Sequence, residues 1–238
     1  MVGAGSYHGP VALRDLLPSL LEILFPSSCL GCGQDGKALC SRCIDGMARA
    51  VPPRCPLCWQ EWRGGGLCSR CASSAPAYKG VRSLLRYEGT VKEAIHAFKF
   101  GGVSVLASCF AVPLAHLLVA WAPPVEALVP VPSPWVRERT RGYNPAHLLA
   151  REVGRIVGLP VLPGLLRRRW TPPQATLPRE RRYQQMAGAV APRRPVNYSS
   201  LLLIDDVVTT GATLNACAHA LLEAGAKEVW ALTLAREG

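Results

Sequence analysis

Four pairs of cysteines, each pair separated by two residues, lie within a stretch of 43 residues. A C-x-x-C turn places two thiolates on one side of a tight loop, and two such turns complete a tetrahedral zinc site. Four thiolates leave no open coordination position, so a zinc ion held in this way is structural and not catalytic. We therefore expect two structural zinc ions. Their ligands would be Cys29, Cys32, Cys40, Cys43, Cys55, Cys58, Cys68 and Cys71.

The pairing of these turns has two solutions. Sequential pairing, with the first two turns on one zinc ion and the last two on another, needs the shortest loops, but interleaved pairing stays open. Disulfides are the alternative to metal and are typical of secreted chains. Residues 1–6 contain neither a basic segment nor a long apolar one, so we expect a cytoplasmic protein with reduced thiols. The remaining Cys109 and Cys217 lie in apolar helical patterns and are expected to pack as small hydrophobic side chains.

A second group of residues suited to chemistry follows the apolar run at residues 201–204, which is typical of a buried parallel strand. Asp205 and Asp206 come directly after this run, then a small loop, then a helix that ends at Gly225. The loop consists of Thr209, Thr210, Gly211, Ala212 and Thr213. Backbone N–H groups and hydroxyls at a helix N-terminus form a cradle for phosphate, and Gly211 allows a close approach of the backbone.

This pattern favours a sugar phosphate as the ligand. Its phosphate would lie in the loop and its hydroxyls on the two aspartates, with Mg²⁺ nearby. The loop has neither the lysine of a Walker A motif nor the G-x-G-x-x-G of a dinucleotide-binding turn, which argues against triphosphate hydrolysis and dinucleotide binding. The alternative is ordinary turn and helix-capping chemistry without a ligand.

Hydrophobic periodicity indicates the elements that position these residues. Strands are expected at residues 81–87, 126–132 and 229–234, the last completing a βαβ unit. A capping box at residues 90–93 is expected to open a helix that carries Ile95, Phe98 and Phe100. Asn144 and Pro145 form a favourable N-cap and N1 pair for a helix that stops at Gly158.

Residues 133–144 are expected to form a basic loop between a strand and a helix. Arg137, Arg139 and Arg141 lie in it, and only Glu138 opposes their charge. A strand, a basic loop and a helix in this order suit the binding of an anion near the carboxyl end of the strand.

Two apolar segments raise the question of a membrane. Residues 103–125 contain no Asp, Glu, Lys or Arg and are long enough to span a bilayer. Pro113, His116 and many small side chains favour a buried helix instead, so no stable membrane insertion is expected. A helix is also expected within residues 1–26. Its apolar face would dock on a neighbouring domain, and an interfacial membrane helix is the alternative.

The chain has 238 residues, 49% of them hydrophobic, and a formal net charge of +11, which excludes a wholly disordered protein. A basic surface suits a nucleic-acid backbone. Residues 167–170 (three arginines and a tryptophan) and the pair Arg193-Arg194 are candidates for single-stranded nucleic acid. A solvated basic loop, or a general bias of composition toward arginine, explains the same residues without a ligand.

In combination, these motifs resemble the ComF competence family (ComFC/GntX-like). Residues 201–213 resemble the phosphoribosyl-pyrophosphate (PRPP) motif of type I phosphoribosyltransferases, and residues 95–101, 130–132 and 141–144 add to the likeness. The resemblance implies that residues 209–213 hold the 5-phosphate and that Asp205 and Asp206 hold the ribose hydroxyls. It further places Arg137 and Arg141 near the pyrophosphate, includes Lys99 among the PRPP-binding residues, and suggests a flexible segment at residues 174–182 that closes over the ligand.

The sequence departs from the family pattern on the side of the second substrate. Pro145 stands where the family usually has Gln, and Gln185 and Met186 stand where it has Asn and Val. The acceptor is therefore unknown. No histidine is a clear general base, because all the candidates lie in helical patterns: His96, His116, His147 and His219.

The resemblance implies an α/β fold: a type I phosphoribosyltransferase-like parallel sheet flanked by helices, preceded by a small cysteine-rich zinc-ribbon domain. The expected divisions are an N-terminal helix at 1–26, a double zinc ribbon at 27–75 and the phosphoribosyltransferase-like domain at 76–238. Two functions follow. One is Mg²⁺-dependent transfer of the phosphoribosyl group from PRPP to an unknown acceptor, acting in DNA uptake and natural transformation or in nucleobase metabolism. The other is a non-catalytic PRPP-sensing or single-stranded-DNA-binding role in DNA uptake, with competence proteins as partners.

Overall fold

The computed structural model describes residues 28–168 and 189–238. The helix expected within residues 1–26, the segment at 174–182 and Trp170 lie outside these residues.

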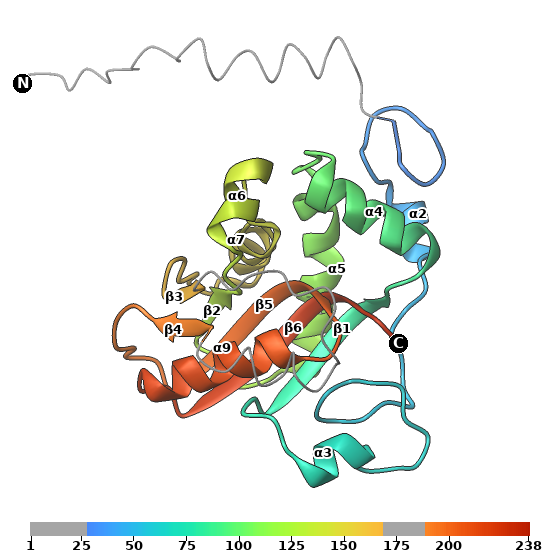
Figure 1. Ribbon diagram of the computed structural model, residues 1–238. Coiled ribbons are helices and arrows are strands. Elements are labelled where there is room, and N and C mark those ends of the chain that lie inside the picture. Colours follow the sequence, from blue (N-terminus) through green and yellow to red (C-terminus); the bar gives the residue numbers. More distant parts are fainter. Residues whose placement is uncertain (1–27, 169–188) are drawn as a thin grey trace, which may run out of the picture.

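The centre of the protein is a four-stranded, fully parallel sheet in the order β1-β6-β5-β2 (Figure 1). Its strands are β1 (Gly80–Arg86), β2 (Ala127–Pro130), β5 (Ser200–Val208) and β6 (Glu228–Arg236). The three expected strands and the βαβ unit are confirmed, and β5 runs on through both aspartates to Val208. A short antiparallel pair, β3 (Leu166–Arg168) and β4 (Val190–Pro192), lies beside the sheet.

Helices cover both faces of this sheet, so the strands alternate between two cores (Figure 1). Leu202 and Ile204 of β5 pack with α4 (Gly89–Phe100), α5 (Leu106–Trp121) and α7 (Pro145–Val157). Leu201 and Leu203 pack with α9 (Ala212–Glu223) on the other face. Because successive strand residues point to opposite faces, a strand covered on both sides is apolar throughout.

The cysteine-rich region contains two short helices, α2 (Ser41–Asp45) and α3 (Ser69–Ser73). Its backbone continues the sheet beyond β1: Ala50 N–H donates to Leu84 O at 3.0 Å, and Arg86 N–H donates to Ala48 O at 2.8 Å. The Arg82 guanidinium lies between the rings of Trp59 and Trp121, 4.1 and 4.8 Å from their centroids. These contacts fix the region against the sheet edge and α5.

Three expectations need correction: the start of one helix, the loop at 133–144 and the burial of Cys109. The helix at 90–93 does not begin with a capping box: α4 begins at Gly89, with Glu88 as an N-cap that makes no side-chain cap bond, and Phe100 is 61% exposed. The expected basic loop contains a helix, α6 (Trp135–Arg141), with no buried residue. Cys109 is half-buried on the wall of a cavity, whereas Cys217 is fully buried as expected.

The apolar segment at 103–125 forms α5, which is 16 residues long. Within the described ranges, no helix combines the length and the apolar character needed to cross a bilayer.

Asn144 links α7 to the end of β2. Its side-chain oxygen accepts from Ala146 N at 3.0 Å, as expected for an N-cap, and its amide nitrogen donates to Val131 O at 3.0 Å. With Pro145 at the first helical position, this residue fixes the direction in which α7 leaves the loop after α6.

We expect Asn144→Ala to lower the free energy of unfolding by about 1–3 kcal/mol, because it removes a helix cap and leaves the buried Val131 carbonyl without its donor. Asn144→Ser keeps a cap acceptor but cannot reach Val131, so its loss should be smaller. Urea unfolding measures both, with Asn197→Ala at an exposed loop position as the control. Equal stability of Asn144→Ala and the control would contradict the role of Asn144 as helix cap and as donor to Val131 O.

Candidate functional site

The two aspartates occupy the carboxyl end of β5. Asp206 continues the face of Leu202 and Ile204 and reaches α4, where its Oδ1 lies 2.6 Å from Lys99 Nζ. Both side chains are largely buried, 12% and 20% exposed respectively. Asp205 is half-buried, and its Oδ1 accepts the Asp206 N–H at 2.9 Å. Lys99 was expected among the PRPP-binding residues from the family resemblance alone, and the structure adds the carboxylate that it pairs with.

The loop after β5 turns sharply at Gly211, whose φ of +81° lies in the left-handed region. A Cβ at this position would lie 3.0 Å from the Tyr78 hydroxyl, so both the backbone conformation and the space favour glycine. Thr210 Oγ1 accepts the Ala212 N–H at 3.3 Å. Thr209 is exposed, Thr213 is half-buried and Ala212 is buried. The hydroxyls and the first N–H groups of α9 are therefore gathered at one turn.

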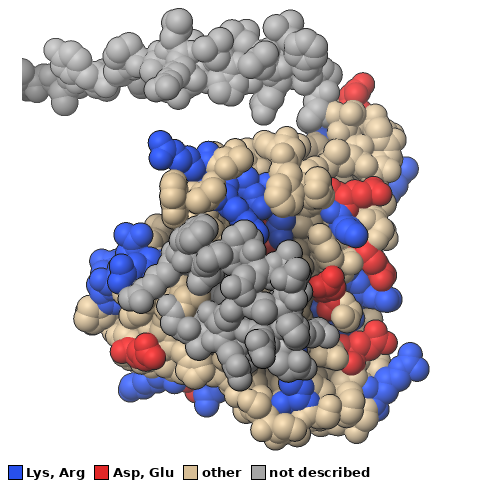
Figure 2. Space-filling model, in the orientation of Figure 1, with Lys and Arg blue, Asp and Glu red and all other residues tan. Residues whose placement is uncertain are grey.

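Basic side chains from α6 complete the surroundings of Asp206. The Arg141 guanidinium stacks on the ring of Phe100 at 4.4 Å from its centroid. Burial lowers the pKa of Arg141, and the charge of the nearby Asp206 opposes that shift, whereas Arg137 adds to it. Tyr143, just beyond α6, donates its hydroxyl to Phe98 O. Figure 2 shows Lys and Arg side chains gathered in the recess between α6 and α4.

The structure thus pairs Asp206 with Lys99, places Arg141 of α6 near enough to Asp206 and to Arg137 to interact electrostatically with both, and sets the glycine turn between β5 and α9. A cavity of about 670 Å³ lies elsewhere, between residues 36–45 and α5, and is lined by Leu39, Cys109 and His116 among others. None of the residues expected to bind PRPP lines that cavity.

The eight cysteines of the C-x-x-C turns form two clusters. We call Cys29, Cys32, Cys40 and Cys43 the first cysteine site, and Cys55, Cys58, Cys68 and Cys71 the second cysteine site. Within each site all four sulfur atoms lie within 4.8 Å of one another, which confirms sequential pairing. All four residues of the second site are buried, whereas Cys32 of the first site is exposed.

The sulfur geometry distinguishes zinc from disulfides. The Sγ atoms of Cys32 and Cys40 are 3.8 Å apart, and those of Cys58 and Cys68 are 3.7 Å apart. A tetrahedron with zinc–sulfur bonds of about 2.3 Å has edges of about 3.8 Å, whereas a disulfide needs about 2.05 Å. The two four-cysteine sites therefore fit two zinc ions.

Backbone N–H groups favour the thiolate form in both sites. Cys40 N–H donates to Cys29 Sγ at 3.3 Å, and this bond is the main reason that the pKa of Cys29 falls to about 6. In the second site Cys68 N–H donates to Cys55 Sγ at 3.4 Å. Burial acts to raise the pKa of Cys55, but the N–H bonds outweigh it and the pKa falls to about 6. One thiol of each site is thereby favoured as a thiolate. A hydrogen bond with Cys40 raises the pKa of Cys43 to about 12, and burial raises the pKa of Cys68 and Cys71, so zinc would displace protons from these thiols when it binds.

The second cysteine site makes one contact that its sequence did not predict. Arg70, between Cys68 and Cys71, donates from Nη1 to the carbonyl oxygen of Thr210 at 3.0 Å. The sequence carries no signal for this contact, because Cys-Ser-Arg-Cys occurs identically at 40–43 and 68–71.

We expect freshly purified, reduced protein to contain two zinc ions per chain, one for each cysteine site. Cys58→Ser should reduce the zinc content to one and lower the melting temperature, because a stretch with few large apolar residues depends on metal for its folding free energy. Cys109→Ser is the matched control and should keep both ions. Elemental analysis measures the content, and a value near zero in the parent protein would refute the zinc sites.

Comparison with known proteins supports the two zinc sites and identifies the family of the chain. Residues 20–72 match the model of the double zinc ribbon domain. "Competence protein F" of Haemophilus influenzae is 30% identical over 71% of this chain and 78% of its own. "DNA utilization protein YhgH" of Salmonella typhi is 31% identical over 82% and 89%. "Competence protein ComFC" of Bacillus subtilis is 28% identical over 83% and 84%.

A solved purine phosphoribosyltransferase from Pyrococcus horikoshii aligns with 54% of this chain and 70% of its own, at 17% identity and a TM-score of 0.34, a value too low to support a conclusion. The sequence relatives are matched over most of their length. Together with the paired cysteine sites and the parallel sheet flanked by helices, they show that the chain belongs to the ComF competence family.

Proposed function

We propose that the protein binds PRPP with Mg²⁺ at the carboxyl end of β5 and transfers its phosphoribosyl group to a nitrogenous acceptor. The observation that carries the proposal is the 2.6 Å ion pair between Lys99 and Asp206 directly before the glycine turn. A largely buried ion pair adds little stability by itself, since the cost of removing both charges from water offsets their attraction. Such pairs with converging polar groups are frequent at functional sites.

Each group has a role in this proposal. Residues 209–213 at the start of α9 hold the 5-phosphate through N–H groups and hydroxyls. Asp205 and Asp206 hold the two ribose hydroxyls, and Arg137, Arg141 and Lys99 face the pyrophosphate. Mg²⁺, bound with the substrate, would supply further positive charge to the leaving group.

The chemistry needs positioning more than covalent help. The bond between ribose C1 and the pyrophosphate oxygen breaks as a bond forms from C1 to the acceptor nitrogen, through an oxocarbenium-like centre. Lysine and arginine side chains stabilise the negative charge that develops on the departing pyrophosphate. Holding acceptor and ribose in line lowers the entropic part of the barrier. The proton of the acceptor nitrogen passes to water or to the departing pyrophosphate, so the step balances without a histidine.

Binding of PRPP with Mg²⁺ should raise the melting temperature. At a ligand concentration about 100 times Kd the gain is about 2.7 kcal/mol, which corresponds to about 5–10 °C for a chain of this size. Asp205→Asn with Asp206→Asn should abolish the shift, because the hydroxyl acceptors lose their charge. Glu223→Gln, an exposed position at the far end of α9, is the control and should retain it.

Absence of a shift in the parent protein would refute PRPP binding. Where a shift is present, a set of nucleobases offered with PRPP and scored by pyrophosphate release separates transfer from sensing. Release with one base supports the enzyme, and no release with any base supports a protein that binds PRPP without turnover.

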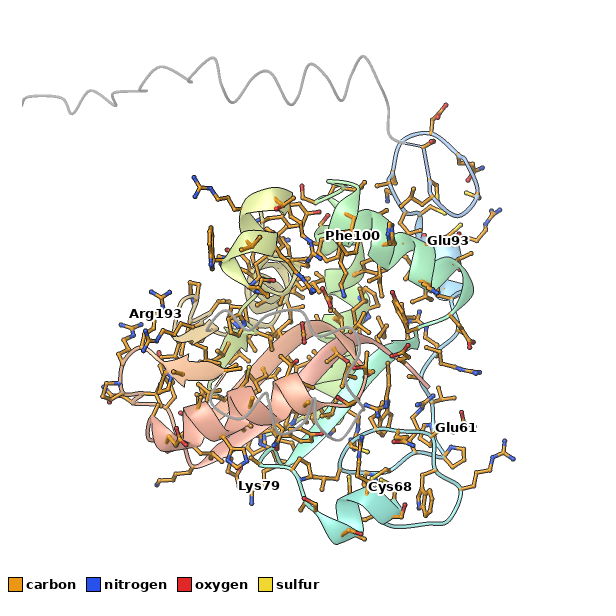
Figure 3. All side chains as sticks on the ribbon, viewed as in Figure 1. Glu61, Cys68, Lys79, Glu93, Phe100 and Arg193 are labelled. Atoms are coloured by element: carbon orange, nitrogen blue, oxygen red, sulfur yellow. The ribbon has the colours of Figure 1, made fainter. Side chains whose placement is uncertain are left out.

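A second candidate function is the binding of single-stranded DNA, in keeping with the names of the competence and DNA-utilization relatives. The observation that favours it is a basic group at the β3–β4 edge. Arg167, Arg193 and Arg194 are exposed there, and no described acidic side chain forms an ion pair with them. Figure 3 labels Arg193 at this edge, and Figure 2 shows the basic surface around it.

Single-stranded DNA should bind with an affinity that falls steeply as salt rises, by a slope of about 0.7 per phosphate neutralised. Replacing Arg167, Arg193 and Arg194 by Gln should reduce that slope by about 2. The matched control replaces Arg63, Arg151 and Arg155, which lie near Glu61 and Glu152 on other parts of the surface. Equal slopes for the two triple variants would remove this edge from the DNA-binding surface.

A further inference from the structure

The second cysteine site and the loop after β5 are joined by hydrogen bonds on two sides. Arg70 Nη1 donates to Thr210 O at 3.0 Å, and Ala77 N–H donates to Asn215 Oδ1, on the first turns of α9, at 2.7 Å. Tyr78, which is 3% exposed, packs between these contacts with its hydroxyl against Gly211. The nine residues from Arg70 to Tyr78 therefore supply three neighbours of the proposed phosphate loop.

The first cysteine site provides an internal comparison. Arg42 lies between Cys40 and Cys43 as Arg70 lies between Cys68 and Cys71, and α2 and α3 are both five residues long with a cysteine at the N-cap. Arg42 is exposed on a site that packs against the face of the sheet carrying α5. The same tetrapeptide thus contacts the loop in one copy only.

The charge of a metal-loaded second cysteine site explains why arginines gather around it. Zn²⁺ with four thiolates carries a net charge of about −2. Arg70 lies between Cys68 and Cys71, two ligands of this site, and its guanidinium donates to Thr210 O. Arg236, at the end of β6, is 2% exposed, and among the described residues its Nε and Nη1 have no hydrogen-bond partner. A buried guanidinium needs a nearby negative charge: burial lowers the pKa of Arg236, and the charge of Cys58 opposes that shift.

The contact with Thr210 also sets the direction of the next N–H group. In a planar trans peptide the carbonyl oxygen and the following N–H point in opposite directions. With Thr210 O held toward Arg70, the N–H of Gly211 must point away from the cysteine site, to the open side of the turn. This is the group that a phosphate in the turn would accept from first.

We propose that Arg70 is a positioning residue that couples the second cysteine site to the phosphate loop, so that a metal-loaded site orients the Thr210–Gly211 peptide for the 5-phosphate. The proposal rests on the proposed function for its ligand, PRPP, but not for the coupling itself. Arg70 need not touch PRPP: its backbone belongs to the Cys68–Cys71 turn of the second cysteine site, and its guanidinium binds the Thr210 carbonyl. The first cysteine site has no described contact of this kind with the loop.

Hydrogen exchange in the absence of ligand tests the coupling. Arg70→Gln should speed amide exchange in residues 208–213 at least several-fold, while both variants of the matched pair, Arg70→Gln and Arg42→Gln, keep two zinc ions and similar melting temperatures. Arg70→Lys, which keeps a charge and one donor toward Thr210, should restore most of the protection. Equal exchange in Arg70→Gln and Arg42→Gln would overturn the proposal.

Calorimetry with PRPP and Mg²⁺ tests the consequence for the ligand. We expect Arg70→Gln to weaken PRPP binding about 10-fold, Arg70→Lys by less, and Arg42→Gln not at all. If the parent protein does not bind PRPP, the proposed function fails while the exchange experiment still decides the coupling. If PRPP binds and Arg70→Gln matches Arg42→Gln in affinity, the coupling to the ligand fails while the proposed function stands.

Zinc release gives a reciprocal measurement, because a coupling between two sites acts equally in both directions. A chelator should remove the ion of the first cysteine site, with its exposed Cys32, before that of the fully buried second site. PRPP with Mg²⁺ should slow the second phase alone, and Arg70→Gln should cancel this effect. Slowing of neither phase, or of both equally, would contradict a specific link through the second site.

Discussion

Burial of β5 on both faces is the constraint on which the rest of the structure depends. A strand enclosed by α9 on one side and by α4, α5 and α7 on the other cannot carry polar side chains along its length. Polar residues are expected only near the ends of such a strand. The two aspartates follow Ile204, the last residue paired with β2, and the glycine turn comes after the end of the strand. Every other group of the candidate site approaches this point from a neighbouring element.

The surrounding elements differ in how they reach this point. Lys99 comes from the last turn of α4 and pairs with Asp206, while Arg141 comes from the last turn of α6 and stacks on Phe100. Arg70 comes from the cysteine-rich region and contacts the loop from outside the sheet. Asp206 and the basic side chains therefore meet on the sheet side of the turn, and Arg70 holds the Thr210 carbonyl on the other side.

Local patterns in the sequence predicted much of this arrangement. The cysteine spacing predicted two metal sites, and the run from Leu201 to Thr213 predicted strand, loop and helix together, because each depends on neighbours in the chain. Asn144 and Pro145 predicted a helix start for the same reason. The ion pair between Lys99 and Asp206 was beyond prediction, since it depends on how α4 lies on the sheet.

The errors also have physical causes. Helix α6 buries no residue, so it has no apolar periodicity, and its arginines suggested a loop. The residues at 90–93 match a capping box, yet Tyr87 N–H bonds to Arg236 O and Val91 N–H bonds to Glu88 O, which starts the helix earlier. Arg42 and Arg70 occupy identical tetrapeptides, so only the tertiary structure distinguishes them.

The backbone bonds between residues 48–50 and β1 have a consequence for the folding of the whole chain. A strand at the rim of a sheet offers unpaired N–H and C=O groups to other molecules, and proteins commonly cover such rims. Here the cover is Ala48 to Ala50, which lies between the two cysteine sites. Loss of zinc would therefore do more than loosen the cysteine-rich region. It would expose the unpaired backbone groups of β1 and make self-association a hazard of the zinc-depleted state.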